Sequence, residues 1–422
     1  MTVAELLEGK LDCPCGKAHP CPIDSVVIGK NACESLVELC GEYKSILLVA
    51  DKNTYAVGGD RVMSLVGEKI SSMQVFDTGD GLLVPNEKAI SDIEAKLMPE
   101  TDLVIGIGSG VINDLCKQVS FTAGLRYYIV ATAPSMDGYA SKGAALILDG
   151  MKVTTNADVP KAIIGDVDML KSAPMDMIRA GYGDIIGKYS CLNDWKLSAL
   201  VNGEYMCEYV LEATYEEVEK TVGLADGLLA RDDDAIATLM QSLVAVGILM
   251  AYVGNSRPAS GSEHHFSHYF EIVGIVRGEE YLAHGVDVCY SAIETAKIRE
   301  ELAAIEDVSE LEYSFDREGY EANIRRVYGS LADEVLALQN KLGWYGVDRV
   351  AVYREKWQEI RKLLSDCPSS SEMIALVEKI GLPYESFKKF YGEEKIRDAY
   401  FYAKDLKDRY SVLWMYYDLF CR

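Results

Sequence analysis

The sequence lacks the features that mark several classes of protein. It has no uninterrupted run of about 18 apolar residues, so we expect no membrane-spanning helix. The N-terminal MTVAELLEGKLD does not join a basic start to an apolar core, so we expect no signal peptide. Eleven cysteines among 422 residues are too few for a disulfide scaffold in a chain of this size. These absences predict a globular protein of the cytoplasm.

Positive charge is also scarce. The chain carries 42 Lys and Arg residues against 66 Asp and Glu residues, a net charge of −24. A body this acidic repels phosphate backbones, which excludes nucleic acid as an expected partner. If the substrate is anionic, its binding site must supply local cations.

The length and the hydrophobic pattern predict two domains. A chain of 422 residues exceeds what one core usually supports. Short apolar runs typical of buried parallel strands occupy residues 46–50, 103–106 and 128–131. Helical spacing dominates after about residue 168, over 175–201, 208–227, 235–253 and 286–304. We therefore expect an α/β domain over residues 1–168, an all-helical domain over 169–422, and a boundary within 166–174.

A glycine-rich loop follows the predicted strand at 103–106. Gly106, Gly108 and Gly110 precede a helix that we expect to begin near Val111. Glycines let backbone N–H groups approach a phosphate, and a helix N-terminus adds partial positive charge. The order GxGxG and the late position in the chain differ from the Rossmann fingerprint. A nucleotide loop and a tight turn without a ligand both fit this pattern.

Asp51 directly follows the apolar run at 46–50. A carboxylate at the end of such a strand often binds the adenosine ribose, which favours NAD over NADP. The alternative is an ordinary loop aspartate.

Histidines cluster in one short segment. Of five in the chain, four lie between residues 264 and 284: His264, His265, His268 and His284. Imidazole is a common ligand of zinc, nickel and iron, and His264 and His268 share one face of a helix. Glu263 precedes the first histidine, whereas a zincin places its glutamate after it. The cluster therefore predicts a metal site other than that of a zincin protease.

A third ligand is required, because catalytic metals usually take three from the protein. Asp184 follows Gly181 and Gly183 in apolar surroundings, at an expected helix start. A buried carboxylate there needs a partner. A metal ligand and an N-terminal helix cap are the two interpretations.

A second group of metal-ligand residues lies near the N-terminus. Cys13, Cys15, His19 and Cys21 form the spacing C-x-C-x3-H-x-C. This is not a standard zinc pattern. A small metal site and an ordinary strand or turn both remain open.

Five ordered segments resemble one family. They are GSGVINDLCK (108–117), APSMDGYAS (133–141), AGYGDIIGKYS (180–190), SRPASGSEHHFSH (256–268) and HG (284–285). Together they are similar to sn-glycerol-1-phosphate dehydrogenases, within the superfamily of iron-type alcohol dehydrogenases, glycerol dehydrogenase and dehydroquinate synthase. The resemblance covers roughly residues 25–422. It implies an α/β nucleotide-binding domain followed by a helical metal-binding domain.

The resemblance implies roles for particular residues. The metal triad would be Asp184, His264 and His284, with His268 beside it facing the substrate. Asp137, Lys188 and His268 would act in catalysis, and Asp137 would also contact the substrate. The residues implied to bind the cofactor are Gly108, Ser109, Gly110, Asp114, Thr132, Ser135 and Ser141. This sequence departs from the family at His284–Gly285–Val286, where the family often has HGE. The proposed metal ligand His284 is present, so we expect only the surroundings of the metal site to differ.

The implied reaction is reduction of dihydroxyacetone phosphate to sn-glycerol-1-phosphate. It would need NADH or NADPH and one divalent metal, zinc first, with nickel or iron as alternatives. For the substrate phosphate we predict Arg257, just before the metal-binding helix, with an interdomain salt bridge as its alternative. Glycerol dehydrogenase, a dehydroquinate synthase-like enzyme and a non-catalytic regulator are the competing functions. Relatives suggest a homo-oligomer, a dimer.

Overall fold

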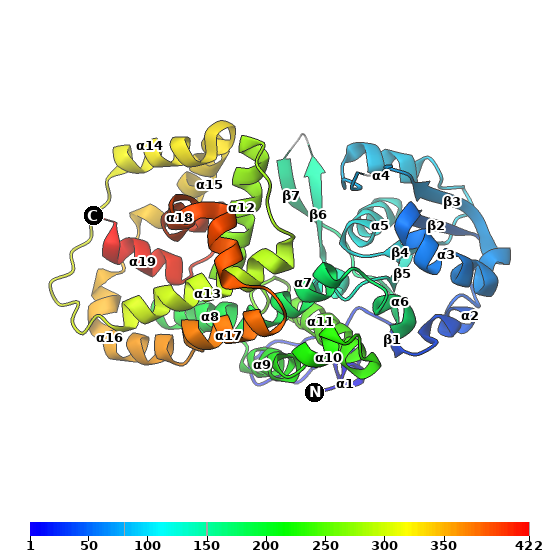
Figure 1. Ribbon diagram of the computed structural model, residues 1–422, viewed down its shortest axis with the longest axis horizontal. Helices are drawn as coiled ribbons and strands as arrows, with labels where there is room; N and C mark the ends of the chain where they lie inside the picture. The colour runs from blue at the N-terminus through cyan, green and yellow to red at the C-terminus, as the bar shows by residue number, and fades with distance from the viewer. Residues whose placement is uncertain (80, 149–150, 422) are drawn as a thin grey trace. The chain divides into compact units, whose positions relative to one another are not determined.

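The structure, a computed structural model, describes residues 1–79, 81–148 and 151–421. By its internal contacts the chain forms two compact units. Unit 1 comprises Met1–Gly181 and Glu219–Ser256, and unit 2 comprises Tyr182–Val218 and Arg257–Arg422. Figure 1 shows the elements of both.

Unit 1 is built on a parallel sheet of six strands in the order β1-β8-β5-β4-β2-β3. A separate antiparallel hairpin joins β6 and β7. The strands are β1 (Ser25–Gly29), β2 (Ile46–Asp51), β3 (Ile70–Phe76), β4 (Leu103–Gly108), β5 (Arg126–Ala131), β6 (Gly143–Leu148), β7 (Met151–Asn156) and β8 (Ala162–Asp166). Every residue of β4 is buried, as a central parallel strand covered on both faces requires.

The helices of unit 1 pack on this sheet and on one another. They are α1 (Val3–Leu7), α2 (Leu36–Leu39), α3 (Lys52–Val66), α4 (Glu87–Glu94), α5 (Gly110–Ala123), α6 (Val167–Leu170), α10 (Ala225–Leu229) and α11 (Asp233–Val253), with a 3₁₀ turn η3 (Asp137–Ala140). In this unit α3 contacts β2, β3 and β4, whereas α5 contacts β4 and β5. The strand order reverses direction between β2 and β4, the place where open α/β sheets usually bind ligands.

Helix α11 is long and apolar enough to cross a membrane by length and composition alone, with a mean hydropathy of 2.0. Its threonine, glutamine and serine interrupt the apolar run, which is why no run of that length is visible in the sequence. Most of its apolar window, 72%, is buried inside the structure. That is the environment of a core helix.

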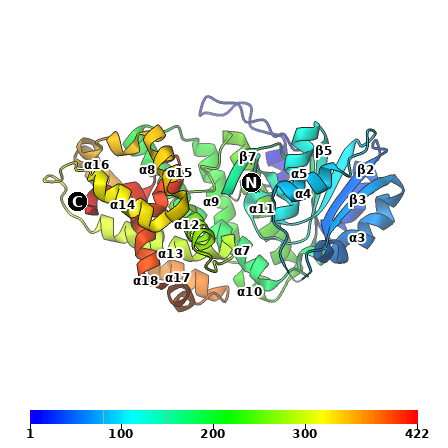
Figure 2. The ribbon, with the colours of Figure 1, turned by 90° about the horizontal axis from the view of Figure 1, so that it is seen from above.

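Unit 2 is helical. Its elements are α8 (Lys188–Asn202), α12 (Ser262–Arg277), α13 (His284–Ala303), α14 (Arg317–Tyr328), α15 (Ala332–Leu342), α16 (Val350–Ser365), α17 (Ser370–Lys379), α18 (Tyr384–Tyr402) and α19 (Val412–Phe420). Two further helices, α7 (Met175–Ile186) and α9 (Glu208–Val222), continue from one unit into the other along the chain. In Figure 2 the helices α12 to α18 form one group, in which α12 and α13 pack closely.

The predicted fold class is confirmed: an α/β region precedes a helical region. The compact units differ from the predicted division at residues 168 and 169. Unit 1 reaches Gly181 and takes in residues 219–256, because α11 packs against η3, α1 and α6 of the α/β region. A helix so distant in sequence joins this core through contacts that a pattern along the chain does not reveal.

Candidate functional site

The residues of the predicted metal triad all belong to unit 2 and come from three helices. Asp184 lies in the last turn of α7, His264 in the first turn of α12, and His284 begins α13. From the sequence, Asp184 was expected at a helix start. That placement is wrong, and so is the alternative of an N-terminal cap, because α7 begins nine residues earlier at Met175.

Asp184 is buried and bonds to two basic groups. Its Oδ1 accepts a hydrogen bond from the Lys188 ammonium at 2.7 Å and lies 3.5 Å from Nε2 of His264. Burial acts to raise the pKa of the Asp184 carboxyl, but the charges of Lys188 and His264 hold that pKa well below its usual range. Asp184 is therefore a carboxylate at neutral pH, ready to bind a cation.

Glu263 orients the ring of His264. Its Oε1 lies 2.7 Å from His264 Nδ1 and also accepts the backbone N–H of Gly261 at 2.9 Å. Burial acts to raise the pKa of the Glu263 carboxyl, but these hydrogen bonds lower it below the usual value. A carboxylate on one ring nitrogen turns the other toward a metal, as is common around metal-bound histidines. Here that other nitrogen, Nε2, faces Asp184.

His284 and His268 complete a group of three imidazoles. The His264 ring centroid lies 5.1 Å from that of His284 and 6.2 Å from that of His268. The His268 and His284 centroids are 5.4 Å apart. Ser267 Oγ lies 3.0 Å from Nδ1 of His284, so this hydroxyl orients the His284 ring.

The donor set fits a divalent ion. Two ligands of one tetrahedral zinc ion, each about 2.05 Å from the metal, are about 3.3 Å apart. The observed 3.5 Å between His264 Nε2 and Asp184 Oδ1 is close to this separation. Both ring orientations come from neighbouring side chains, Glu263 and Ser267, so the donors are held in place without the ion.

The predicted cofactor loop lies at the carboxyl ends of β4 and β5 in unit 1. Ser109 precedes α5, but its side chain makes no capping bond to that helix. Its Oγ instead bonds to Ser135 Oγ at 2.6 Å, and the Thr132 N–H donates to the carbonyl of Gly108. The Ser109 side chain therefore does not cap the first N–H groups of α5. An anion site at a helix N-terminus requires such uncapped N–H groups. A Cβ built on Gly110 meets no atom within 3.6 Å apart from its neighbours.

Lys117 holds the segment after β5. This buried lysine of α5 donates to the carbonyls of Gly138 and Gly143, at 2.6 and 3.1 Å, and to Ser141 Oγ at 3.2 Å. It also lies 3.7 Å from the carboxylate of Asp114. In this way the glycine loop and the segment with Ser135, Asp137 and Ser141 form one structural element.

Asp51 ends β2, the neighbour of β4 in the sheet. Its Oδ1 accepts the N–H groups of Asn53 and Thr54 at 2.8 and 2.9 Å, which caps α3. Asp51 and the glycine loop thus lie at the same edge of the sheet, on either side of the point where the strand order reverses.

Arg257 forms a buried ion pair within unit 2. Its Nε and Nη2 donate to the two carboxylate oxygens of Glu204, at 2.8 and 2.6 Å, and Nη2 also donates to the Tyr410 carbonyl. Arg257 is only 2% exposed. A salt bridge was the alternative to the predicted phosphate role, although this one lies within unit 2 and is not the interdomain bridge that was expected.

Comparison with known proteins places the chain in a family. Residues 27–174 match the family model described as iron-containing alcohol dehydrogenase. The glycerol-1-phosphate dehydrogenase [NAD(P)+] of Bacillus licheniformis is 30% identical over 410 residues, covering 95% of this chain and 90% of that protein. The chain belongs to the glycerol-1-phosphate dehydrogenase family. Another member, from Hyperthermus butylicus, is 32% identical over 60% of this chain and 74% of its own length.

Solved structures of other proteins have the same fold as this member of the glycerol-1-phosphate dehydrogenase family. Glycerol dehydrogenase from Schizosaccharomyces pombe aligns with a TM-score of 0.53 at 15% identity, over 88% of this chain and 92% of that one. Sulfoacetaldehyde reductase from Bifidobacterium kashiwanohense, in complex with NAD+, aligns with a TM-score of 0.59 at 13% identity, over 95% of this chain and 98% of that one. At these identities the similarity concerns the fold alone.

Three residues of the candidate site were not predicted from the sequence. Glu263 was considered only as a mismatch to the zincin motif, and Ser267 and Lys117 were not considered. A carboxylate adjacent to a predicted histidine ligand could have indicated Glu263. For Ser267 and Lys117 the signal lies in three-dimensional contacts, because their partners are 17 to 26 residues away.

Proposed function

We propose that this chain is a metal-dependent dehydrogenase that reduces dihydroxyacetone phosphate to sn-glycerol-1-phosphate with NADH or NADPH. The observation that carries the proposal is the set of Asp184, His264 and its orienting partner Glu263, in a chain that aligns with named glycerol-1-phosphate dehydrogenases over nearly its whole length. The reaction consumes one carbonyl compound, one reduced nicotinamide and one proton. It forms one secondary alcohol and one oxidised nicotinamide.

In this proposal Asp184, His264 and His284 hold one divalent ion, with zinc first and nickel or iron as alternatives. When bound, such an ion supplies Lewis acidity toward a carbonyl oxygen, and nicotinamide supplies the hydride. Lys188 acts through Asp184, because its ammonium donates to the carboxylate oxygen at 2.7 Å. It keeps that carboxylate ionised and fixed in position.

The glycine loop binds the nucleotide in this proposal. Gly108, Ser109 and Gly110 offer backbone N–H groups at the start of α5 to the pyrophosphate. Asp51 reaches the adenosine ribose with its second carboxylate oxygen, while the first caps α3. The remaining predicted cofactor residues are Asp114, Thr132, Ser135 and Ser141, which belong to the loop or to segments bonded to it.

The product alcohol needs a proton at the former carbonyl oxygen. Asp137 and His268 remain our candidates for moving it, and both remain candidates for substrate contact. His268 lies beside His284 with its ring partly exposed. Arg257 stays a candidate for the substrate phosphate only if the Glu204 pair opens, because two of its nitrogens are engaged.

A reconstitution assay tests the proposal. Protein stripped by a chelator should not oxidise NADH with dihydroxyacetone phosphate, and zinc, nickel or iron should restore the reaction. His264→Ala should abolish the restored activity. His265→Leu is the matched control: His265 is the adjacent, fully buried residue of α12, and neither of its ring nitrogens has a hydrogen-bond partner among the described residues. Full activity of metal-free His264→Ala protein contradicts the mechanism.

The same assay separates the competing functions. Turnover of unphosphorylated dihydroxyacetone, but not of the phosphate ester, indicates a glycerol dehydrogenase. Tight NAD binding without turnover of any polyol phosphate indicates a regulator. We further propose a cytoplasmic location and a homodimer.

A further inference from the structure

The N-terminal segment of unit 1 closes into a small loop. Lys10 and His19 form an antiparallel bridge, with reciprocal backbone hydrogen bonds of 2.8 and 2.9 Å. Between them the Gly16 N–H donates to the Cys13 carbonyl at 3.0 Å, and Gly16 has a φ of +82°, which favours glycine. The chain therefore turns tightly at the two predicted cysteines and brings them back toward His19.

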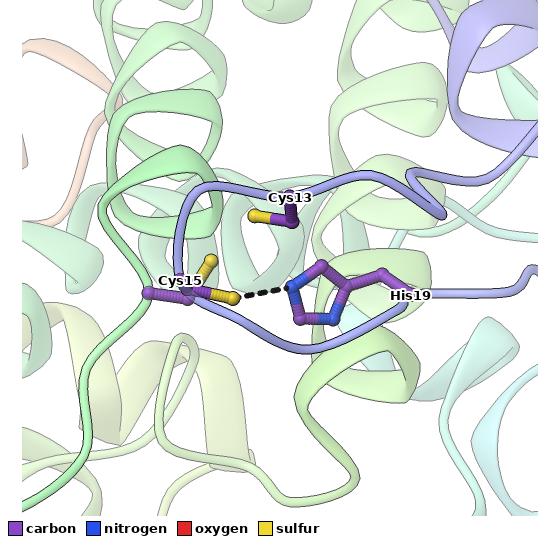
Figure 3. A group of neighbouring side chains, drawn as sticks. Cys13, Cys15 and His19 are labelled. Atoms are coloured by element: carbon purple, nitrogen blue, oxygen red, sulfur yellow. Dashed lines mark hydrogen bonds between the residues drawn. The ribbon is translucent and has the colours of Figure 1, made fainter.

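Three metal-ligand side chains meet inside this loop. The Sγ atoms of Cys13 and Cys15 and a ring nitrogen of His19 lie within 4.8 Å of one another. Figure 3 shows these side chains close together inside the turn of the loop. Cys15 Sγ is 3.2 Å from His19 Nε2. Cys21, the fourth residue of the predicted cluster, is not in this group among the described residues.

Tyr252 fixes the tautomer of His19. The backbone carbonyl of Tyr252 lies 2.9 Å from His19 Nδ1, and a carbonyl can only accept, so Nδ1 carries the proton. The imidazole is fully buried and stacks on the Tyr252 ring, with centroids 5.6 Å apart and planes 10° from parallel. A neutral ring then presents the lone pair of Nε2 to the cysteine sulfurs. Histidines that bind metals are usually oriented in this way by a carbonyl or a carboxylate.

We propose that Cys13, Cys15 and His19 bind a structural zinc ion through two thiolates and one imidazole. In tetrahedral zinc sites sulfur and nitrogen ligands are about 3.5 Å apart, and two sulfurs about 3.8 Å apart. The distances here differ from these values by amounts that side-chain rotation can adjust. A fourth ligand, water or another side chain, completes the coordination. The ion links the N-terminal loop to Tyr252, near the end of α11.

Cobalt substitution tests this site separately from the proposed catalytic site. A cobalt ion bound by thiolates shows a sulfur-to-metal charge-transfer band in the near ultraviolet, whereas Asp184, His264 and His284 offer no thiolate. We expect the band in the wild-type holoenzyme, purified under reducing conditions, and in His264→Ala. It should be lost in the Cys13→Ser/Cys15→Ser double variant, together with one equivalent of zinc measured by elemental analysis.

Cys21→Ser is the matched control, since it removes a neighbouring thiol that does not belong to the group of Cys13, Cys15 and His19. It should keep both the band and the zinc. The proposal is overturned if cobalt-loaded wild-type protein lacks the band, if the double variant retains it, or if Cys13 and Cys15 form a disulfide. Should the double variant fail to fold, zinc must still protect Cys13 and Cys15 of the wild-type protein from alkylation, as read by mass spectrometry; equal labelling with and without zinc refutes the site.

Discussion

Replacement of Glu263 by Gln should weaken metal binding without removing any proposed ligand. The Glu263 carboxylate accepts from His264 Nδ1 at 2.7 Å and from the Gly261 N–H at 2.9 Å, and it is fully buried. Gln has nearly the same shape, and its amide oxygen can still accept both bonds, because a single carboxylate oxygen accepts both in Glu263. What it removes is the negative charge, which strengthens the bond and raises the basicity of the imidazole.

The size of the effect follows from the type of bond. A hydrogen bond to a charged group contributes about 1.5–3 kcal/mol, and a neutral one about 1 kcal/mol. Loss of the charge at Glu263 therefore costs about 0.5–2 kcal/mol of metal binding, which corresponds to a dissociation constant about 2- to 30-fold higher. Ser267→Ala removes a neutral bond to His284 Nδ1, so its effect should be about 5-fold.

Competition with a chromophoric chelator measures these affinities directly. The matched control is Asp287→Asn, a buried carboxyl on α13 whose oxygens accept from the Tyr391 hydroxyl. The Asp287 oxygens bond to the Tyr391 hydroxyl and not to a proposed metal ligand, so metal affinity in Asp287→Asn should stay at the wild-type level. Wild-type affinity in Glu263→Gln would refute the role of this carboxylate, and an equal loss in Asp287→Asn would show that the effect is not specific to the site.

Three further predictions concern the nucleotide loop and the buried ion pair. Gly110→Ala should leave the melting temperature nearly unchanged, since the added Cβ meets nothing closer than 3.6 Å, but should weaken NADH binding measured by fluorescence; unchanged binding would argue against a pyrophosphate at this loop. Asp51→Asn keeps a cap for α3 and should raise kcat/KM for NADPH relative to NADH, and an unaltered ratio would separate Asp51 from the ribose. Arg257→Ala should lower the free energy of unfolding by about 2 kcal/mol, less than for a fully buried pair because Glu204 is partly exposed. Burial acts to raise the pKa of Glu204, but Arg257 lowers that pKa below its usual value. The stabilisation from this ion pair should therefore be complete above the unfolded pKa of Glu, about 4.3, and should decline as the pH falls below it. Urea unfolding at pH 6 and pH 3.5 measures this decline, which should be smaller in Arg257→Ala.

Much of the fold was predictable because its signals are local. The apolar runs that became β2, β4 and β5 are buried parallel strands, and such strands need continuous apolar sequence. The helix after the glycine loop begins at Gly110, one residue from the expected Val111. The stretch 175–201 was expected to be helical, with a helix start near Asp184, whereas the boundary between α7 and α8 lies at Gly187. A helix boundary of this kind depends on packing, since a side chain at Gly187 would meet Val288 and Glu263.

The candidate site, like the fold, was predictable from the sequence only where its signals are local. The spacing of His264 and His268 on one helix, and the clustering of four histidines, follow from the sequence alone. Their partners do not, because Asp184 reaches His264 from another helix 80 residues earlier in the chain. For Arg257 the sequence left two interpretations, a phosphate site and a salt bridge. The position of Glu204 in the structure shows that Arg257 forms an ion pair.

The fold class, the order of the motifs and the residue types that could bind a metal can be read from the chain alone, because hydrophobic periodicity and side-chain chemistry are local properties. Which of those residues meet depends on how the chain folds in three dimensions. Glu263 aims His264 at Asp184, and Tyr252 turns His19 toward Cys15 across 233 residues of chain. Such contacts follow from the packing of distant helices and loops, which no pattern along the sequence specifies.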